Sequence, residues 1–170
     1  MKIVKGRIKF TGELAPDLDL IIKHLGTCRD FDNLILKGHL LIEHLLNEYI
    51  LSESKEKIDL KKMNFTFYQK LNICKILGLF SLNKTIYKSI ERLNSLRNSV
   101  THRLEYDKDI LSKFIEFTYN RFPNPEIFVG ESLYGKEFSQ FYISILILYS
   151  EIKTSSVALK EYWSKISVNK

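Results

Sequence analysis

The chain has 170 residues, of which 45% are hydrophobic and 27% charged, so we expect one domain over residues 1–170 with a buried core. Its formal net charge of +6 permits an acidic partner such as RNA, although the basic residues are scattered along the chain. Two cysteines without ligand spacing disfavour a disulfide framework, and no apolar run approaches the roughly 20 residues of a membrane span, so we expect a cytoplasmic protein without a membrane partner.

The first predicted elements are short. Residues 1–14 alternate loosely between apolar and polar side chains, which indicates a strand, a hairpin or an extended arm. A short helix is predicted over residues 17–25, ended by Gly26. The first long helix is predicted from Asp30 to Leu51, because apolar residues recur at spacings of three and four over a wide face. The polar residues 52–62 are predicted to form a loop.

Four further helices are predicted, over residues 64–77, 83–102, 108–121 and 136–166. Gly78 is the expected stop of the first of these, and Pro123 and Pro125 end the third. The expected fold is therefore all-α, an antiparallel bundle of four to five main helices. Its core covers about residues 30–122, and the long C-terminal helix follows.

The helix over residues 83–102 has two contrasting faces. Apolar residues line one side of it: Ile86, Ile90, Leu93, Leu96 and Val100, with Leu104 extending the line. Polar residues recur at spacings of three and four on the other side: Glu91, Asn94, Asn98 and His102. Arg97 stands next to Asn98, so the last two turns carry an arginine, an amide and a histidine together.

These three residue types can cleave RNA without a metal. The imidazole of His102 exchanges a proton near neutral pH, and the guanidinium of Arg97 keeps a positive charge against a phosphate. RNA supplies its own nucleophile in the 2'-hydroxyl group. Asn98 can orient the histidine or donate to a phosphate oxygen. Arg97, His102 and Asn98 are therefore the candidate catalytic residues, and neither a metal nor a cofactor is required.

Simpler interpretations of the same residues stay open. A histidine near a helix C-terminus is favoured by the helix dipole alone, and a helical arginine is often a solvated side chain. Arg97 and His102 are also five residues apart, which is about 140° around an ideal helix. One helix alone does not direct both groups at one phosphate, unless it distorts near its end or two copies pair their motifs.

A second histidine pattern, His39-x-x-x-Glu43-His44, resembles a metal-binding helix only superficially. The zincin pattern needs two histidines four residues apart with the glutamate after the first, whereas His39 and His44 are five residues apart. A structural hydrogen bond or a pair on one helix face, such as His39 with Glu43, is favoured over a metal site.

The run Leu93-Asn94-Ser95-Leu96-Arg97-Asn98-Ser99-Val100-Thr101-His102 resembles the signature of HEPN domains, and residues 36–46 resemble the earlier helix of that family with Glu43 at its acidic position. The resemblance covers about residues 30–122. It implies an all-α homodimer in which two Arg-x4-His motifs meet, and a metal-independent endoribonuclease that leaves a 2',3'-cyclic phosphate. It also implies catalytic roles for Arg97 and His102.

Further expectations follow from the same resemblance. Asn98, Glu43 and Asn94 would support catalysis or RNA binding, and the protein would act as a toxin or in phage defence, with an antitoxin or another regulatory protein as a possible partner. One subgroup carries a regulatory tyrosine two residues after the histidine, where this chain has Leu104. Two alternatives remain, namely a non-catalytic helical binding module and a nucleotide-binding sensor that uses Arg97 for a phosphate.

Overall fold

The computed structural model describes residues 3–4, 7–8, 21, 23–54, 59–103, 105–121 and 135–168. Over these residues the chain is almost entirely helical, which confirms the all-α class. Its elements are β1 (Ile3–Val4), β2 (Arg7–Ile8), α2 (Phe31–Glu53), α3 (Leu60–Met63), α4 (Phe67–Ile76), α5 (Lys84–Arg103), α6 (Lys108–Tyr119) and α7 (Lys136–Val168).

The N-terminal predictions are confirmed where the structure describes them. Strands β1 and β2 pair antiparallel, with Ile3 opposite Ile8, as in the predicted hairpin; the other residues of 1–14 lie outside the described part. Of the short helix predicted over 17–25, residues 21 and 23–25 are helical and Gly26 follows in a turn, while 17–20 and 22 lie outside the described residues.

Local capping explains where the helix boundaries differ from those predicted. Helix α4 begins at Phe67 because the side chains of Thr66 and Gln69 form a capping box that satisfies the first backbone N–H groups. It ends before Gly78, whose φ of 90° suits a residue without a Cβ. The loop predicted over 52–62 was partly wrong, because α2 continues to Glu53 and α3 begins at Leu60; residues 55–58 lie outside the described part.

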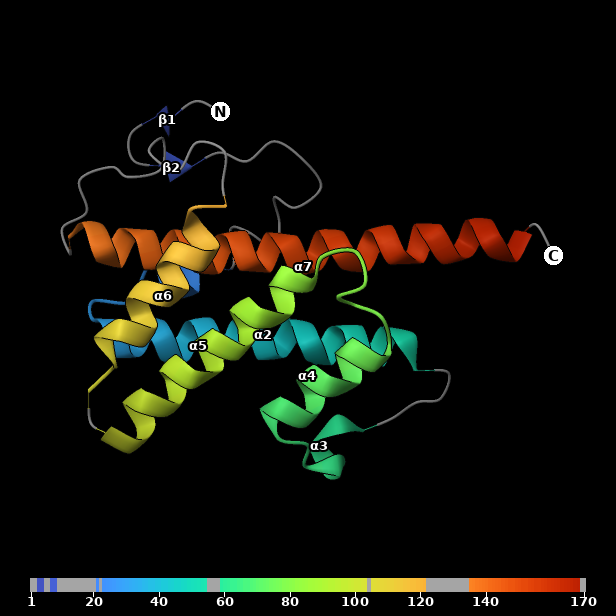
Figure 1. The fold of residues 1–170 in the computed structure, drawn as a ribbon, viewed down its shortest axis with the longest axis horizontal. Helices are drawn as coiled ribbons and strands as arrows, with labels where there is room; N and C mark the ends of the chain where they lie inside the picture. Colours follow the sequence, from blue (N-terminus) through green and yellow to red (C-terminus); the bar gives the residue numbers. More distant parts are fainter. Residues whose placement is uncertain are drawn as a thin grey trace.

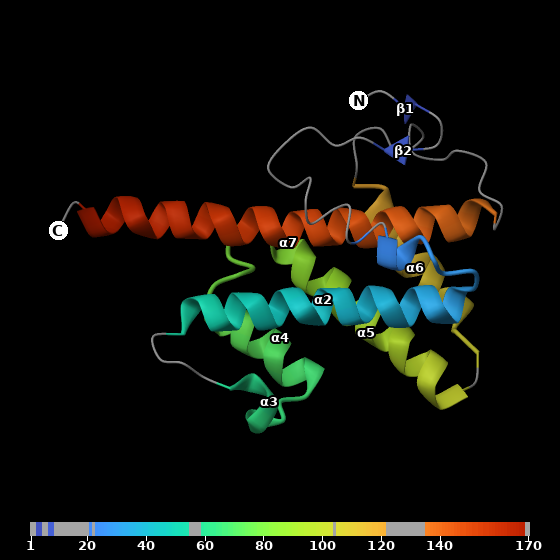
Figure 2. The same cartoon turned by 180° about the vertical axis from the view of Figure 1, so that it is seen from behind.

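Two long helices form the frame of the bundle. Helices α2 and α7 lie side by side and run in the same direction (Figures 1 and 2). They approach closely at Gly38, where an added Cβ atom would lie 3.0 Å from Cδ1 of Ile145. Helix α6 packs against α7 and runs antiparallel to α5, which crosses the frame obliquely (Figure 1).

Helix α5 is central, because it packs against α2, α4, α6 and α7. Its predicted apolar face is confirmed. Val100 is half-buried, and four residues are fully buried: Ile86, Ile90, Leu93 and Leu96. Leu104 lies outside the described residues. The two cysteines are free and buried in the core. Among the described residues, no helix is long and apolar enough to span a membrane.

Candidate functional site

The candidate motif occupies the last two turns of α5, where the helix emerges from the core. Arg97 and Asn98 are both half-buried. Nη1 of Arg97 donates a hydrogen bond of 3.1 Å to Oδ1 of Asn98. The amide therefore orients the guanidinium, which differs from the two roles considered for Asn98 in the sequence, namely orienting the histidine or donating to a phosphate oxygen.

His102 lies in the final turn of α5 and is exposed. No described residue forms a hydrogen bond or ion pair with its ring, so both ring nitrogens can reach a solvent-borne ligand. The neighbouring hydroxyl of Thr101 bonds back to the carbonyl oxygens of Arg97 and Asn98, at 3.3 and 3.2 Å. His102 is thus the most accessible of the three candidate catalytic residues, since Arg97 and Asn98 are half-buried.

Asn94, one turn before Asn98, is held by a different helix. Its Oδ1 accepts a hydrogen bond of 3.1 Å from Nε2 of His39 on α2. The His39 ring is buried and stacks against Phe67, with 4.1 Å between ring centroids. Burial lowers the pKa of His39, the hydrogen bond to Asn94 and the charge of Glu43 oppose this effect, and the charge of Arg97 adds to it. The ring is therefore a neutral structural contact.

This contact corrects one expectation. The structural hydrogen bond predicted for His39 exists, but its partner is Asn94 and not Glu43. On the polar face of α5, Asn94 thus connects α5 to α2.

Glu43 forms an ion pair with a lysine of α4. Nζ of Lys70 lies 2.6 Å from Oε1 of Glu43, and the two side chains are 12% and 24% exposed. His44, the next residue of α2, pairs with Glu48 at 3.3 Å. Among the described residues, no group of three or more His, Cys, Asp or Glu side chains is arranged to hold a metal ion. Glu43 therefore stabilises the packing of α2 against α4 next to His39.

Ser99, within the motif itself, has a structural role. It is buried, its hydroxyl donates to the carbonyl oxygen of Leu96 at 2.7 Å, and its Oγ accepts from the backbone N–H of Asp107 at 3.1 Å. Asp107 in turn caps the N-terminus of α6. These bonds fix the turn that follows His102.

Among the predicted site residues, one chain joins only Arg97 and Asn98 by a hydrogen bond. Asn94 is bonded to His39 and Glu43 to Lys70, neither of which was a predicted site residue. Arg97 and His102 lie on the same regular helix, so their separation of about 140° around its axis is retained. A single copy therefore presents a guanidinium and an imidazole on adjacent surfaces and does not close them around one phosphate.

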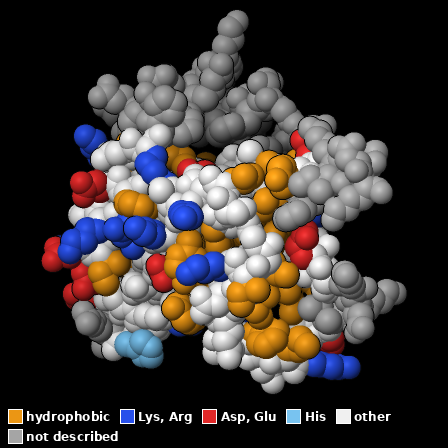
Figure 3. All heavy atoms as spheres, turned by 45° about the vertical axis from the view of Figure 1, so that its right-hand side comes forward, with side chains coloured by type: hydrophobic (Ala, Val, Ile, Leu, Met, Phe, Trp, Pro, Cys, Tyr) orange, Lys and Arg blue, Asp and Glu red, His pale blue; other side chains and the backbone are white. Residues whose placement is uncertain are grey.

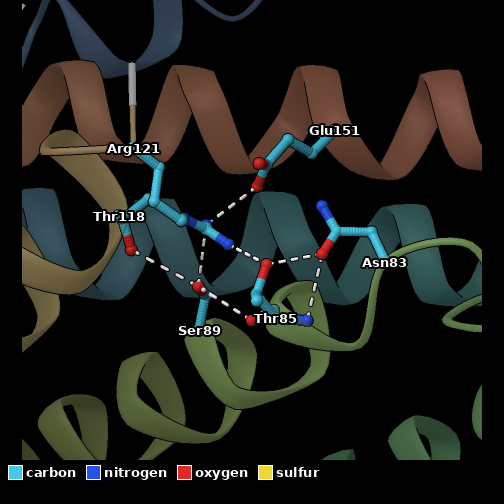
Figure 4. Close-up of polar contacts among 6 residues, drawn as sticks. All are labelled: Asn83, Thr85, Ser89, Thr118, Arg121 and Glu151. Carbon is cyan, nitrogen blue, oxygen red and sulfur yellow. Dashed lines mark hydrogen bonds and ion pairs between the residues drawn. The ribbon is translucent and has the colours of Figure 1, made fainter. Parts of the chain in front are cut away.

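A second polar cluster lies at the opposite end of α5 (Figure 4). We name it the Arg121 cluster; its members are Asn83, Thr85, Ser89, Thr118, Arg121 and Glu151. The guanidinium of Arg121 donates to the hydroxyls of Thr85 and Ser89 and pairs with Glu151 on α7 at 3.0 Å. Burial raises the pKa of Glu151, and Arg121 opposes the effect.

Sequence reasoning missed the Arg121 cluster, although a signal for it exists. Glu151 is the only charged residue between Phe138 and Ile152, an otherwise apolar and weakly polar part of α7. An isolated carboxylate in such a segment points to a buried partner. The sequence does not show which cation that partner is.

The face of the molecule drawn in Figure 3 shows no continuous basic groove among the described residues. Lys and Arg side chains there are interspersed with acidic and hydrophobic side chains. Comparisons of the chain with protein-family models, with curated proteins and with solved structures found no match.

Proposed function

We propose that the protein is a metal-independent endoribonuclease whose site is assembled from Arg97, Asn98 and His102. The observation that carries the proposal is the accessibility of an imidazole and a guanidinium: His102 is exposed, and half-buried Arg97 is oriented by Asn98 at 3.1 Å. The resemblance of residues 93–102 to the HEPN signature supports the same assignment.

The proposed reaction uses the 2'-hydroxyl of the RNA as nucleophile. An imidazole takes the 2'-hydroxyl proton, the 2'-oxygen forms a bond to phosphorus, and the bond from phosphorus to the 5'-oxygen breaks as that oxygen receives a proton. The guanidinium of Arg97 stabilises the additional negative charge on the phosphoryl oxygens. The products are a 2',3'-cyclic phosphate and a free 5'-hydroxyl.

The proposal includes a homodimer. The 140° between Arg97 and His102 leaves each motif incomplete in one copy, whereas two copies paired through the ends of their α5 helices would bring two imidazoles and two guanidiniums to one RNA. One imidazole would then act as base and the other as acid. Sedimentation of the purified protein tests this point, because an active species that remains a monomer at assay concentration would contradict it.

The cleavage test uses bulk RNA in EDTA. We expect the wild-type chain to cleave it and both Arg97→Ala and His102→Ala to lose at least about 100-fold in rate, the scale of one catalytic group. His44→Ala is the matched control. His44 is another exposed helical histidine, it lies outside the motif, and it pairs with Glu48. Full activity of Arg97→Ala or His102→Ala would contradict the catalytic role proposed for that residue.

A specific observation favours the alternative of a non-catalytic binding module. Asn94 and Glu43, two of the proposed supporting residues, are engaged in contacts that hold α5 and α4 to α2. The module would bind RNA or a protein without cleaving it, so folded wild-type protein that leaves RNA intact in the same assay would favour it.

The proposed role as a toxin or phage-defence effector rests on the resemblance alone. Expression in a bacterium is the test, with growth arrest expected for the wild-type chain and relieved by His102→Ala. A restraining antitoxin would then be sought as a protein that suppresses the arrest when it is co-expressed.

A further inference from the structure

A pocket on the α6 side of α5 lies apart from the motif. It encloses about 380 Å³, and we name it the Phe117 pocket. This volume lies within the range of small-molecule sites. Six residues line the pocket: Arg92, Lys113, Glu116, Phe117, Asn120 and Arg121.

Two guanidinium groups lie over the Phe117 ring. The central carbon of Arg92 is 3.9 Å from the ring centroid and that of Arg121 is 5.2 Å away. A guanidinium held against an aromatic face keeps its N–H groups directed outward in its own plane, where they can meet the oxygens of an anion. The ring thus fixes the orientation of both cations.

Each guanidinium has a buried nitrogen without a hydrogen-bond partner. These atoms are Nη1 of Arg92 and Nε of Arg121. The remaining donors of Arg121 reach Thr85, Ser89 and Glu151, whereas no described residue hydrogen-bonds to Arg92. Unpaired buried donors are rare because they lose their hydration without compensation, so the two guanidiniums keep hydrogen-bonding capacity that the described protein does not use.

The charges around the pocket are predominantly positive. Arg92, Lys113 and Arg121 are cationic, and exposed Glu116 is the opposing charge in the lining. Glu151 neutralises Arg121 from the α7 side but does not line this pocket. Arg92 and Lys113 are therefore left without an acidic partner in the described structure.

We propose that the Phe117 pocket binds a phosphate ester, with Arg92 and Lys113 as its principal ligands. The two sources of this group are a free nucleotide and the backbone of an RNA chain. Arg92 lies five residues before Arg97, which is about 7.5 Å along the helix and 140° around it. The site therefore differs from the proposed cleavage site and does not depend on it.

Calorimetric titration of the His102→Ala protein, which keeps RNA intact if the proposed function holds, tests the site with three probes: inorganic phosphate, adenosine monophosphate and a six-nucleotide RNA. We expect saturable binding of the monophosphate or of the RNA, weakened at least about tenfold by Arg92→Gln, the effect of losing one charge-assisted hydrogen bond. Lys113→Gln should weaken the same binding by a smaller factor. Lys160→Gln, an exposed residue of α7 away from the pocket, is the control and should bind as the parent does.

The probes distinguish the sources. If Arg92→Gln weakens the binding of adenosine monophosphate, the pocket is a nucleotide site. If Arg92→Gln weakens only the binding of RNA, the pocket binds the RNA backbone. Lys113→Gln, at an exposed position, provides the answer if Arg92→Gln does not fold. Absence of binding for all three probes, or equal affinities for the parent and both variants, would overturn the proposal.

Discussion

The two ends of α5 use polar side chains in opposite ways. At its N-terminal end, Thr85 and Ser89 join Arg121 and Glu151 in a network that connects three helices (Figure 4). At its C-terminal end, the side chain of Arg97 forms a hydrogen bond with its neighbour Asn98, and His102 has no hydrogen-bond partner among the described residues. The first arrangement holds helices together, whereas the second leaves a guanidinium and an imidazole available.

Asn94 combines features of both ends of α5. It belongs to the motif run, yet it reaches across to His39 on α2 and so contributes to packing. The comparison therefore predicts a gradient along α5, in which removal of a polar group costs most stability at the Arg121 cluster, less at Asn94 and little at Arg97 and His102. Each of the following substitutions tests one part of this gradient.

The largest loss is expected for Arg121→Met. This substitution leaves half-buried Glu151, 24% exposed, without its cation, and breaking the pair in this way costs about 3 kcal/mol of unfolding free energy, the lower end of the range for buried pairs. Urea unfolding followed by circular dichroism measures the change.

The double variant Arg121→Met, Glu151→Leu is the control for the first prediction. It removes both charges, and a buried pair replaced by apolar residues is often neutral, so it should recover at least about half of the lost stability. Wild-type stability in the single variant would show that the Arg121 cluster does not hold α5, α6 and α7 together.

The next effect is expected at Asn94. Asn94→Ala leaves Nε2–H of His39 buried without an acceptor, which costs about 1–3 kcal/mol in the same unfolding experiment. Asn98→Ala is the matched control, because it is the same change one turn later and removes only a contact with Arg97. Equal losses in the two variants would remove the distinction between packing and motif residues.

A pH dependence follows from the same contact. Because burial lowers the pKa of His39 below its ordinary value of 6.5, the unfolded chain binds this proton more readily than the folded chain. Stability from the neutral ring is therefore present above pH 6.5 and is lost as the pH falls below it.

The measurement compares wild-type and His39→Gln proteins by urea unfolding between pH 7.5 and 5.5. One proton limits the slope to about 1.4 kcal/mol per pH unit, and the variant should show a smaller loss on acidification than the wild type. Parallel curves for the two proteins would mean that His39 titrates normally in the folded state.

The helices themselves were largely predictable, because apolar periodicity depends on the chain alone. The face of α5 from Ile86 to Leu96 repeats at helical spacing, and those residues are buried. The first residue of α4 was harder to predict, since it depends on the capping box of Thr66 and Gln69 and not on periodicity.

Contacts between distant segments account for the remaining differences. The sequence placed Asn94 on a polar face but did not reveal that His39, 55 positions earlier, would meet it. The same limit applies to Arg121 and Glu151, which are 30 positions apart, since Arg121 follows the end of α6 and Glu151 lies in α7. Periodicity identifies the face of a helix, whereas the partner on that face depends on how the helices cross.

The smallest effect on stability is expected at the motif itself. Arg97→Ala and His102→Ala remove side chains that form at most one hydrogen bond with a described neighbour, so each should change the unfolding free energy by less than about 0.5 kcal/mol. Replacement by alanine also improves helix propensity by a few tenths of a kcal/mol, which partly offsets any loss. Urea unfolding of both variants, performed on the samples used in the RNA assay, makes the measurement.

This last prediction gives the cleavage assay its meaning. A variant that unfolds at the wild-type urea concentration but no longer cleaves RNA has lost chemistry and not structure, whereas Ser99→Ala should show the reverse pattern. Ser99 bridges the carbonyl of Leu96 and the backbone of Asp107, so its removal should cost about 1–2 kcal/mol while the groups proposed to act on RNA stay in place. A loss above about 1 kcal/mol in Arg97→Ala or His102→Ala would mean that these two side chains also serve packing, and their contrast with the Arg121 cluster would disappear.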